Sequence, residues 1–164
     1  MGVGKTSLGK KIANRLQYEF IDTDMLIENK MGISVNEIFD LHGETYFREL
    51  EKEQLNEVKE MSKVVISTGG GLPCFNNLMD EILETGITVW LDVPTKIIVN
   101  RVTEAKEERP LLKNKSKEEL FQFIDEAIDL RSEFYSQAHL RFENVSVNAQ
   151  KLDQLVDQIR TASI

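Results

Sequence analysis

The chain opens on a glycine-rich turn that leads directly into an amphipathic segment. Residues 1–7 read MGVGKTS, the second half of the phosphate-binding pattern GxxxxGK(S/T). In the full pattern, backbone N–H groups at a helix start hold phosphates, the lysine reaches the terminal phosphates and the hydroxyl binds magnesium. We therefore expect Lys5 on phosphate and Thr6 on the metal, unless the turn is only a frayed end. The rest of this nucleotide cradle is expected to be Gly2, Val3, Gly4 and Ser7.

Beyond this turn, short β-type runs alternate with longer amphipathic stretches. The alternation predicts an α/β fold, with helices in layers on both sides of a central parallel sheet. The expected strands are 18–21, 64–67, 87–93 and 140–145. The expected helices are 5–16, 25–31, 35–41, 44–61, 77–84, 94–104, 116–138 and 150–159. Ser34 with Glu37, and Ser116 with Glu119, predict capping boxes at two of the helix starts.

The composition excludes several classes of protein. The length of 164 residues fits a single domain. Lysine and arginine number 20 against 28 acidic residues, and the net charge of -8 argues against a nucleic-acid partner. The longest apolar runs, such as 87–93, are far shorter than the roughly 20 residues of a membrane span. Cys74 is the single cysteine, so an internal disulfide is excluded, and we expect a cytoplasmic location.

Five further motifs follow along the chain. Asp22-Thr23-Asp24 ends a predicted strand, at the edge where open α/β sheets bind ligands, although such a pair alone more often serves turns and caps. The other motifs are FRELE at 47–51, Thr68 followed by GGG at 69–71, RPLL at 109–112, and Arg131 with Tyr135 and Ala138. The charge-rich run 105–116 is a candidate mobile lid over a core made of 1–104 and 117–164.

In order and spacing, these motifs resemble the shikimate kinases, whose pattern is a phosphate-binding loop, DxD, FRxxE, a GGG turn, RPLL in the lid and RxxxYxxA. The resemblance covers nearly the whole chain, and only the loop is cut at its front. It implies a transferase that uses ATP and Mg²⁺ to phosphorylate the 3-hydroxyl of shikimate, on the way to chorismate and the aromatic amino acids. It also implies a substrate-binding helical region at 25–61. We expect a monomer whose partner is shikimate, with neither nucleic acid nor membrane.

The resemblance also implies roles for the residues of the substrate site. Arg48 and Arg131 would form a cationic fork for the shikimate carboxylate. The backbone amides of Gly69, Gly70 and Gly71 would approach the substrate closely, which a Cβ would hinder. These glycines thus belong to the predicted substrate site.

The same resemblance assigns the catalytic and nucleotide-binding residues. Asp24 would receive the attacking hydroxyl as a base or an orienting acceptor, and Asp22 would act on magnesium through water. Lys5 and Arg109 would stabilise charge on the moving phosphoryl group. Arg101 would contact the adenine from the base of the lid.

Plainer interpretations of these residues stay open. Arg48 can pair with Glu44 or Glu51 on a solvated helix, and Arg131 can pair with a neighbouring carboxylate. Arg109 can be a solvated charge of the lid, and the three glycines can form a turn that binds nothing. The residues alone do not decide between these interpretations.

Other functions for the whole chain are open too. It can be another small-metabolite kinase, gluconate-kinase-like or nucleoside-monophosphate-kinase-like, or a nucleotide-binding fragment without turnover. Because the loop lacks its first glycine and the strand that feeds such loops, we expect the natural protein to begin about ten residues earlier, with Met1 an internal methionine. Without that strand, the two strands beside it would lose their shared partner.

Overall fold

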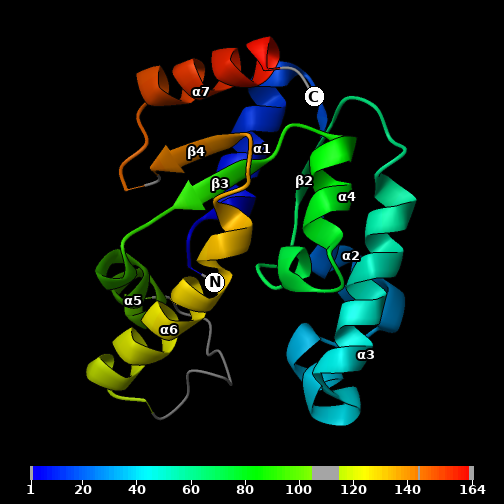
Figure 1. Cartoon of the computed structure of the whole chain (residues 1–164), viewed down its shortest axis with the longest axis vertical. Coiled ribbons are helices and arrows are strands. Elements are labelled where there is room, and N and C mark those ends of the chain that lie inside the picture. Colours follow the sequence, from blue (N-terminus) through cyan, green and yellow to red (C-terminus); the bar gives the residue numbers. More distant parts are fainter. Residues whose placement is uncertain (1, 105–114, 144, 163–164) are drawn as a thin grey trace.

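The computed structural model describes residues 2–104, 115–143 and 145–162 (Figure 1). The strands are β1 (Glu19–Asp22), β2 (Val64–Ser67), β3 (Val89–Asp92) and β4 (Leu140–Glu143). The helices are α1 (Lys5–Leu16), α2 (Thr23–Met31), α3 (Val35–Val58), the 3₁₀ turn η1 (Leu72–Cys74), α4 (Leu78–Thr85), α5 (Thr95–Glu104), α6 (Lys117–Tyr135) and α7 (Ala149–Thr161). Strands and helices alternate along the chain, as the α/β prediction expected.

The strands associate in two parallel pairs. β1 lies beside β2 with Asp22 opposite Ser67, and β3 lies beside β4 with Asp92 opposite Glu143. The expected central sheet is therefore present as two pieces, since no ladder joins β2 to β3 among the described residues. Within each pair the carboxyl ends of the strands meet at one edge, and ligands bind at such edges in open α/β sheets. Asp22 and the turn after Ser67 thus open onto the same edge.

Helices α1 and α7 pack together against the strands (Figure 1). Leu8 and Ile12 of α1 and Leu155 of α7 are buried with apolar residues from β2, β3 and β4. Gly9 lies so close to Phe20 of β1 that a Cβ at this position would be 2.5 Å from the ring. This close contact packs the second turn of α1 against Phe20 of β1.

α2 and α3 form a second core of their own. Ile27 of α2 packs with Ile38, Phe47 and Leu50 of α3. The sequence predicted two helices separated at Gly43, and the backbone of Gly43 is indeed non-helical, with φ 80° and ψ 173°, so that α3 consists of two helical halves joined at a kink. A positive φ favours glycine. The predicted break is therefore present as a change of direction within α3.

α5 and α6 pair around a third core, on either side of the predicted lid. Ile98 and Val99 of α5 pack with Leu120 of α6, and Thr95 Oγ1 donates a hydrogen bond to Asp125 Oδ1 at 2.6 Å. Residues 105–114 of the lid lie outside the described residues. Among the described helices, none is long and apolar enough to cross a membrane.

The predicted capping boxes are confirmed, and several element ends shift. The Ser34 and Ser116 side chains each accept from the backbone three residues on, and the glutamate there returns the bond. α2 begins at Thr23 and not at 25, because Asp22 already serves as its N-cap residue. α6 ends at Tyr135 and not at 138, since Ser136 is the C-cap residue.

Candidate active site

The phosphate-binding turn enters α1 through a left-handed residue. Gly4 is the N-cap residue of α1 with φ 90°, a conformation that favours glycine. Lys5 and Thr6 then form the first turn of the helix, where backbone N–H groups have no partners inside the helix and attract anions. Thr6 Oγ1 donates a hydrogen bond to Asp22 Oδ2 at 2.8 Å. The two predicted metal ligands therefore meet at the end of β1.

α5 and its last turn lie beside the phosphate-binding turn. A Cβ at Gly2 would be 2.8 Å from Val102 Cγ2. Arg101 Nη1 donates to the Val3 carbonyl at 3.3 Å, and its Nη2 donates to the Val145 carbonyl at 3.0 Å. Arg101 thus joins the phosphate-binding turn to the loop that precedes α7, a position compatible with a nucleotide contact.

Asp24 lies in the first turn of α2, just past the end of β1. Burial raises the pKa of its carboxyl above the ordinary value, and the negative charges of Asp22 and Glu28 raise it further. The positive charge of Lys5 opposes this shift. Asp24 Oδ1 is buried and has no hydrogen-bond partner in the part of the chain that the structure describes. Lys5 and Asp24 are therefore close enough for each charge to act on the other.

Arg48 lies in the second half of α3 and is only 9% exposed. Its Nη2 donates to Glu44 Oε1 at 2.7 Å, and its Nη1 donates to Glu51 Oε2. Glu51 is fully buried, and this burial raises the pKa of its carboxyl while Arg48 lowers it. Both pairings of the plainer interpretation are thus present, but Arg48 lies in a buried place and not on a solvated helix face. A guanidinium has five N–H donors, so these two carboxylates do not exhaust it.

The glycine turn after β2 is packed against polar side chains. A Cβ at Gly69 would lie 1.9 Å from Glu51 Oε1 and 3.2 Å from Asp24 Oδ1. A Cβ at Gly71 would lie 2.2 Å from Arg48 Nη2. A turn that only reverses the chain does not require such close approach. The missing side chains are therefore what lets these polar groups reach the backbone.

The middle glycine faces α6. A Cβ at Gly70 would lie 3.1 Å from the Tyr135 hydroxyl and 3.5 Å from Arg131 Nη1, and the hydroxyl donates to the Gly70 carbonyl at 2.6 Å. Burial raises the pKa of the nearby Cys74 thiol, and the charges of Arg131 and Arg48 both lower it. The two arginines predicted as a fork therefore converge on one turn from different helices.

Buried carboxylate oxygens without partners lie beside this turn. Asp24 Oδ1 and Glu51 Oε1 both border Gly69, and neither has a hydrogen-bond partner among the described residues. Polar groups buried in folded proteins are normally hydrogen-bonded. Such oxygens are the acceptors that a ligand hydroxyl requires.

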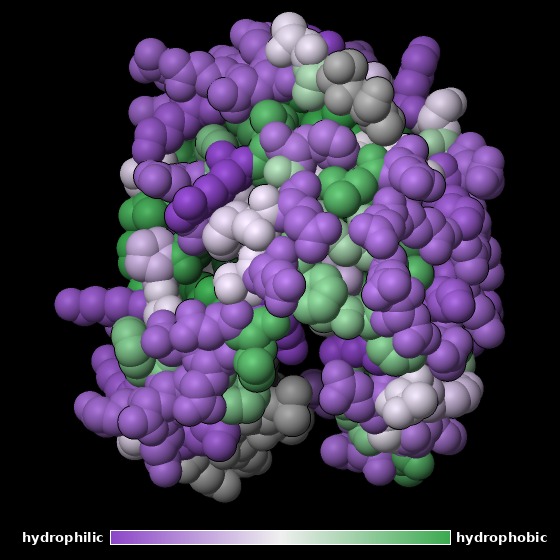
Figure 2. Space-filling model, in the orientation of Figure 1, coloured by the Kyte–Doolittle hydropathy of each residue, from purple (hydrophilic) through white to green (hydrophobic). Residues whose placement is uncertain are grey.

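The surface is hollowed beside the turn. Figure 2 shows a hollow between the lower ends of α5 and α6 on one side and of α3 on the other. In Figure 1 the glycine turn and η1 lie above this hollow, between α6 and α3.

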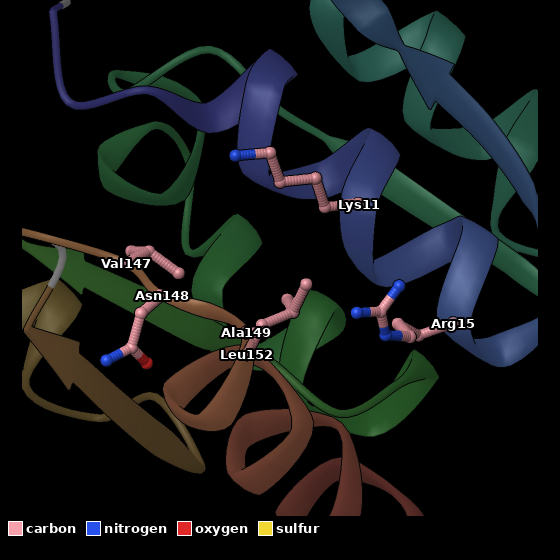
Figure 3. Close-up of a pocket in the computed structure, with 6 residues that line it drawn as sticks. All are labelled: Lys11, Arg15, Val147, Asn148, Ala149 and Leu152. Atoms are coloured by element: carbon pink, nitrogen blue, oxygen red, sulfur yellow. The ribbon is translucent and has the colours of Figure 1, made fainter.

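A separate cavity of about 260 Å³ lies between α1 and the start of α7 (Figure 3). It is lined by Lys11, Arg15, Val147, Asn148, Ala149 and Leu152. None of these residues contributes to the glycine turn, and Arg15 already pairs with Asp153 at 2.8 Å. We therefore do not count this cavity as part of the candidate site.

The structure thus divides the predicted residues into two adjoining groups. One lies around the start of α1 and the end of β1, and the other surrounds the glycine turn. Arg109 lies outside the described residues. From the sequence, Glu51 was expected only as an ion-pair partner of Arg48 on a solvated helix, and Tyr135 was given no role. The burial of Glu51 and the bond from Tyr135 to Gly70 depend on the tertiary fold.

Comparisons with known proteins agree with this geometry. Residues 1–162 match the family model described as shikimate kinase. A shikimate kinase of Bacteroides fragilis is 48% identical over 139 residues, which cover 85% of this chain and 78% of the relative. The crystal structure of shikimate kinase from Bacteroides thetaiotaomicron superposes with a TM-score of 0.90 at 42% identity, covering 98% of this chain and 92% of that one. A structure of the Acinetobacter baumannii enzyme in complex with shikimate gives a TM-score of 0.81 at 31% identity, covering 98% and 86%.

Proposed function

The chain belongs to the shikimate kinase family, and from this premise we propose how its residues transfer the γ-phosphate of ATP to the 3-hydroxyl of shikimate. Membership makes the chain a kinase that phosphorylates shikimate, with ATP as the phosphate donor, in the pathway to the aromatic amino acids. The roles of single residues, the metal and the acceptor hydroxyl are proposals.

The observation that carries the substrate site is the convergence of two arginines on one glycine turn. Shikimate has a carboxylate and three hydroxyls, so its site requires cations at one end and hydrogen-bonding groups along the ring. We assign Arg48 and Arg131 to the carboxylate. Gly69, Gly70 and Gly71 keep the backbone open to the ring, and their closeness to both guanidinium groups supports this assignment.

Asp24 receives the attacking hydroxyl in this proposal. Its Oδ1 is a buried acceptor without a partner among the described residues, and burial raises its pKa, which favours taking up a proton. Phosphoryl transfer requires little of a base and much of positioning. Asp24 therefore acts mainly by orienting the hydroxyl toward the phosphate. Lys5 stabilises the negative charge that develops on the phosphoryl group during transfer.

The residues at the start of α1 hold the nucleotide. The amides of Gly2, Val3, Gly4 and Ser7 are the proposed phosphate cradle, and Lys5 is the proposed phosphate ligand. Thr6 and Asp22 fit magnesium, because a hydroxyl and a carboxylate oxygen 2.8 Å apart are the hard donors that it prefers, with waters and phosphates as further ligands. When bound, the metal would neutralise phosphate charge. Thr6 would contact it directly and Asp22 through water.

Two arginines complete the proposal for the nucleotide. Arg101 lies against the phosphate-binding turn and is assigned to the adenine. Arg109, in the RPLL motif, is assigned to the transferring phosphoryl group. The lid 105–116, a substrate-binding region at 25–61, a monomeric state and a cytoplasmic location belong to the same proposal.

A coupled assay of ADP release tests this function most directly. Purified protein would be given ATP and Mg²⁺ with shikimate, gluconate or a nucleoside monophosphate in turn, at several concentrations. We expect saturable turnover with shikimate and only background with the other two acceptors. Faster turnover with gluconate or a nucleotide would replace the proposal with another small-metabolite kinase, and no turnover with any acceptor would favour a nucleotide-binding fragment.

A further inference from the structure

Tyr135 stands where the glycine turn meets α6. It is the last residue of α6 and follows Arg131 by one helical turn, so the two side chains lie on the same face of the helix. Its hydroxyl donates a hydrogen bond to the Gly70 carbonyl at 2.6 Å. The same glycine faces Arg131 Nη1. Tyr135 therefore ties the helix that carries one arm of the fork to the middle of the turn.

This bond also sets the direction of the next backbone amide. The peptide between Gly70 and Gly71 is trans, as are the other described peptides, so its C=O and N–H point in opposite directions. With the carbonyl held toward Tyr135, the N–H of Gly71 is directed away from α6. Glycine has no side chain to restrict rotation of this peptide, and its backbone is the most permissive of all residues. The Leu72 N–H donates to the Gly69 carbonyl at 3.2 Å and closes the turn around this peptide, and the Tyr135 hydroxyl adds a bond from outside the turn.

The tyrosine ring is itself held in place. Its centroid lies 6.1 Å from that of Trp90 in β3, and the Arg141 guanidinium carbon lies 4.8 Å from the centre of the Trp90 ring. Burial raises the pKa of the Tyr135 hydroxyl above its ordinary value, although Arg131 lowers it. The hydroxyl therefore stays protonated at neutral pH and remains a donor to Gly70.

We propose that Tyr135 is a positioning residue for shikimate binding, whose hydroxyl fixes the Gly70–Gly71 peptide and keeps the turn in register with Arg131. The proposal rests on the assignment of Arg131 and the glycine turn to the shikimate site. A positioning role and a purely structural role predict different effects when the hydroxyl is removed. Loss of the hydroxyl should loosen one ligand site while the fold, the nucleotide site and the chemical step persist.

The variant Tyr135→Phe tests this proposal, since it removes the hydroxyl and keeps the ring against Trp90. We expect the KM for shikimate to rise about tenfold, the loss typical of one good hydrogen bond. The KM for ATP and kcat should stay within about twofold of the wild type. Calorimetric titration with shikimate, without nucleotide, should show a similar rise in Kd and does not depend on turnover.

Tyr18→Phe is the matched control. Tyr18 is 40% exposed and precedes Glu19, which pairs with Val64 at the opposite end of the β1–β2 pair from the glycine turn, so the same atom is removed away from the turn. A double-variant comparison then asks whether Tyr135 acts through the site. In an Arg131→Ala background, Tyr135→Phe should raise the Kd for shikimate by less than about threefold, because effects of residues that act on one ligand group are not additive.

Three outcomes would overturn the proposal. The first is a Tyr135→Phe variant whose shikimate KM and Kd match those of Tyr18→Phe. The second is an equal rise in both KM values together with a lower melting temperature, which would make the hydroxyl a structural tie only. The third is a tenfold rise in the Kd for shikimate when Tyr135→Phe is made in the Arg131→Ala background. Failure of the proposed function is recognised separately, because the wild type itself would then not turn over shikimate.

Discussion

The two halves of the candidate site are built in opposite ways. The phosphate half consists of a short stretch of chain at the start of α1, where Gly4 is exposed and Lys5 and Thr6 are half-buried. The substrate half is assembled from β2, α2, α3 and α6 around the glycine turn. There Arg48 is 9% exposed and Glu51 is fully buried.

This difference separates the two kinds of work that the site does. Phosphate charge can be met by backbone amides and a helix start that any sequence with the right turn provides. A ring with a carboxylate at one end requires binding side chains at fixed distances from one another. Side chains keep such positions only when the residues around them are tightly packed. We therefore expect changes in the phosphate half to affect kcat and changes in the substrate half to affect the KM for shikimate, with a loss of stability as well where the buried Arg48–Glu51 pair is broken.

The largest expected effect is that of Lys5→Ala on kcat. Removing one group that stabilises transition-state charge typically costs a factor of 10² to 10³, and we expect roughly a thousandfold loss. The melting temperature should change by less than about 2 °C, because Lys5 is only half-buried at the first position of α1, and substitutions outside the core usually cost little stability. Steady-state kinetics and a thermal melt measure the two quantities. Near-normal kcat would remove Lys5 from the phosphate site.

Arg48→Ala, unlike Lys5→Ala, should strongly lower the free energy of unfolding. It leaves the buried Glu51 carboxylate without its partner, and breaking a buried pair from one side typically destabilises by about 3 kcal/mol or more. Urea unfolding would measure this loss, with Arg131→Ala as the comparison, since Arg131 has no such buried ion pair among those described. The double variant Arg48→Met, Glu51→Gln should recover most of the stability while shikimate binding stays weak. If Arg48→Ala unfolds at the wild-type urea concentration, the ion pair is not structural.

Gly71→Ala tests the close approach at the turn. The added Cβ would lie 2.2 Å from Arg48 Nη2, so the guanidinium must move. We expect the KM for shikimate to rise about tenfold with the KM for ATP unchanged, since small displacements of a positioned group are costly. Gly86→Ala is the control, because nothing lies within 4 Å of a Cβ there and its backbone is extended. Equal kinetics for the two variants would mean that Arg48 does not depend on the turn.

The smallest expected effect concerns the capping box at the start of α6. The Ser116 backbone and side chain hold the pKa of Glu119 below its ordinary value. A carboxyl with a lowered pKa stabilises the fold above its unfolded pKa of about 4.5, and this contribution is lost as the pH falls through the folded pKa. Glu119→Ala should therefore lower the melting temperature by roughly 1–3 °C at pH 7 and by less at pH 3, with kinetics unchanged. If Glu119→Ala lowered the melting temperature more at pH 3 than at pH 7, the ionised carboxyl of Glu119 would not be what stabilises the fold.

The same contrast explains what the sequence could predict. The alternation of elements, both capping boxes and the glycine turn that leads into α1 were predictable, because each depends on residues within a few positions of one another. Arg48 and Arg131 were placed only through the resemblance, since no local pattern brings α3 and α6 to one turn. The spacing predicted Glu51 as a partner of Arg48 but not its burial, and the bond from Tyr135 to Gly70 was missed for the same reason. Their roles depend on burial and on contacts across the fold, which spacing along the chain does not encode.

The most direct test of the account is a calorimetric titration of the nucleotide-free chain with shikimate, comparing the wild type with Arg131→Ala. Because Arg48 and the glycine turn are held by contacts within the protein, we expect the wild type to bind shikimate at one site before any nucleotide is added. Losing a charge-assisted hydrogen bond should then raise the Kd at least about tenfold in Arg131→Ala. Equal affinities, or wild-type binding that requires a nucleotide, would contradict a preformed shikimate site at the glycine turn.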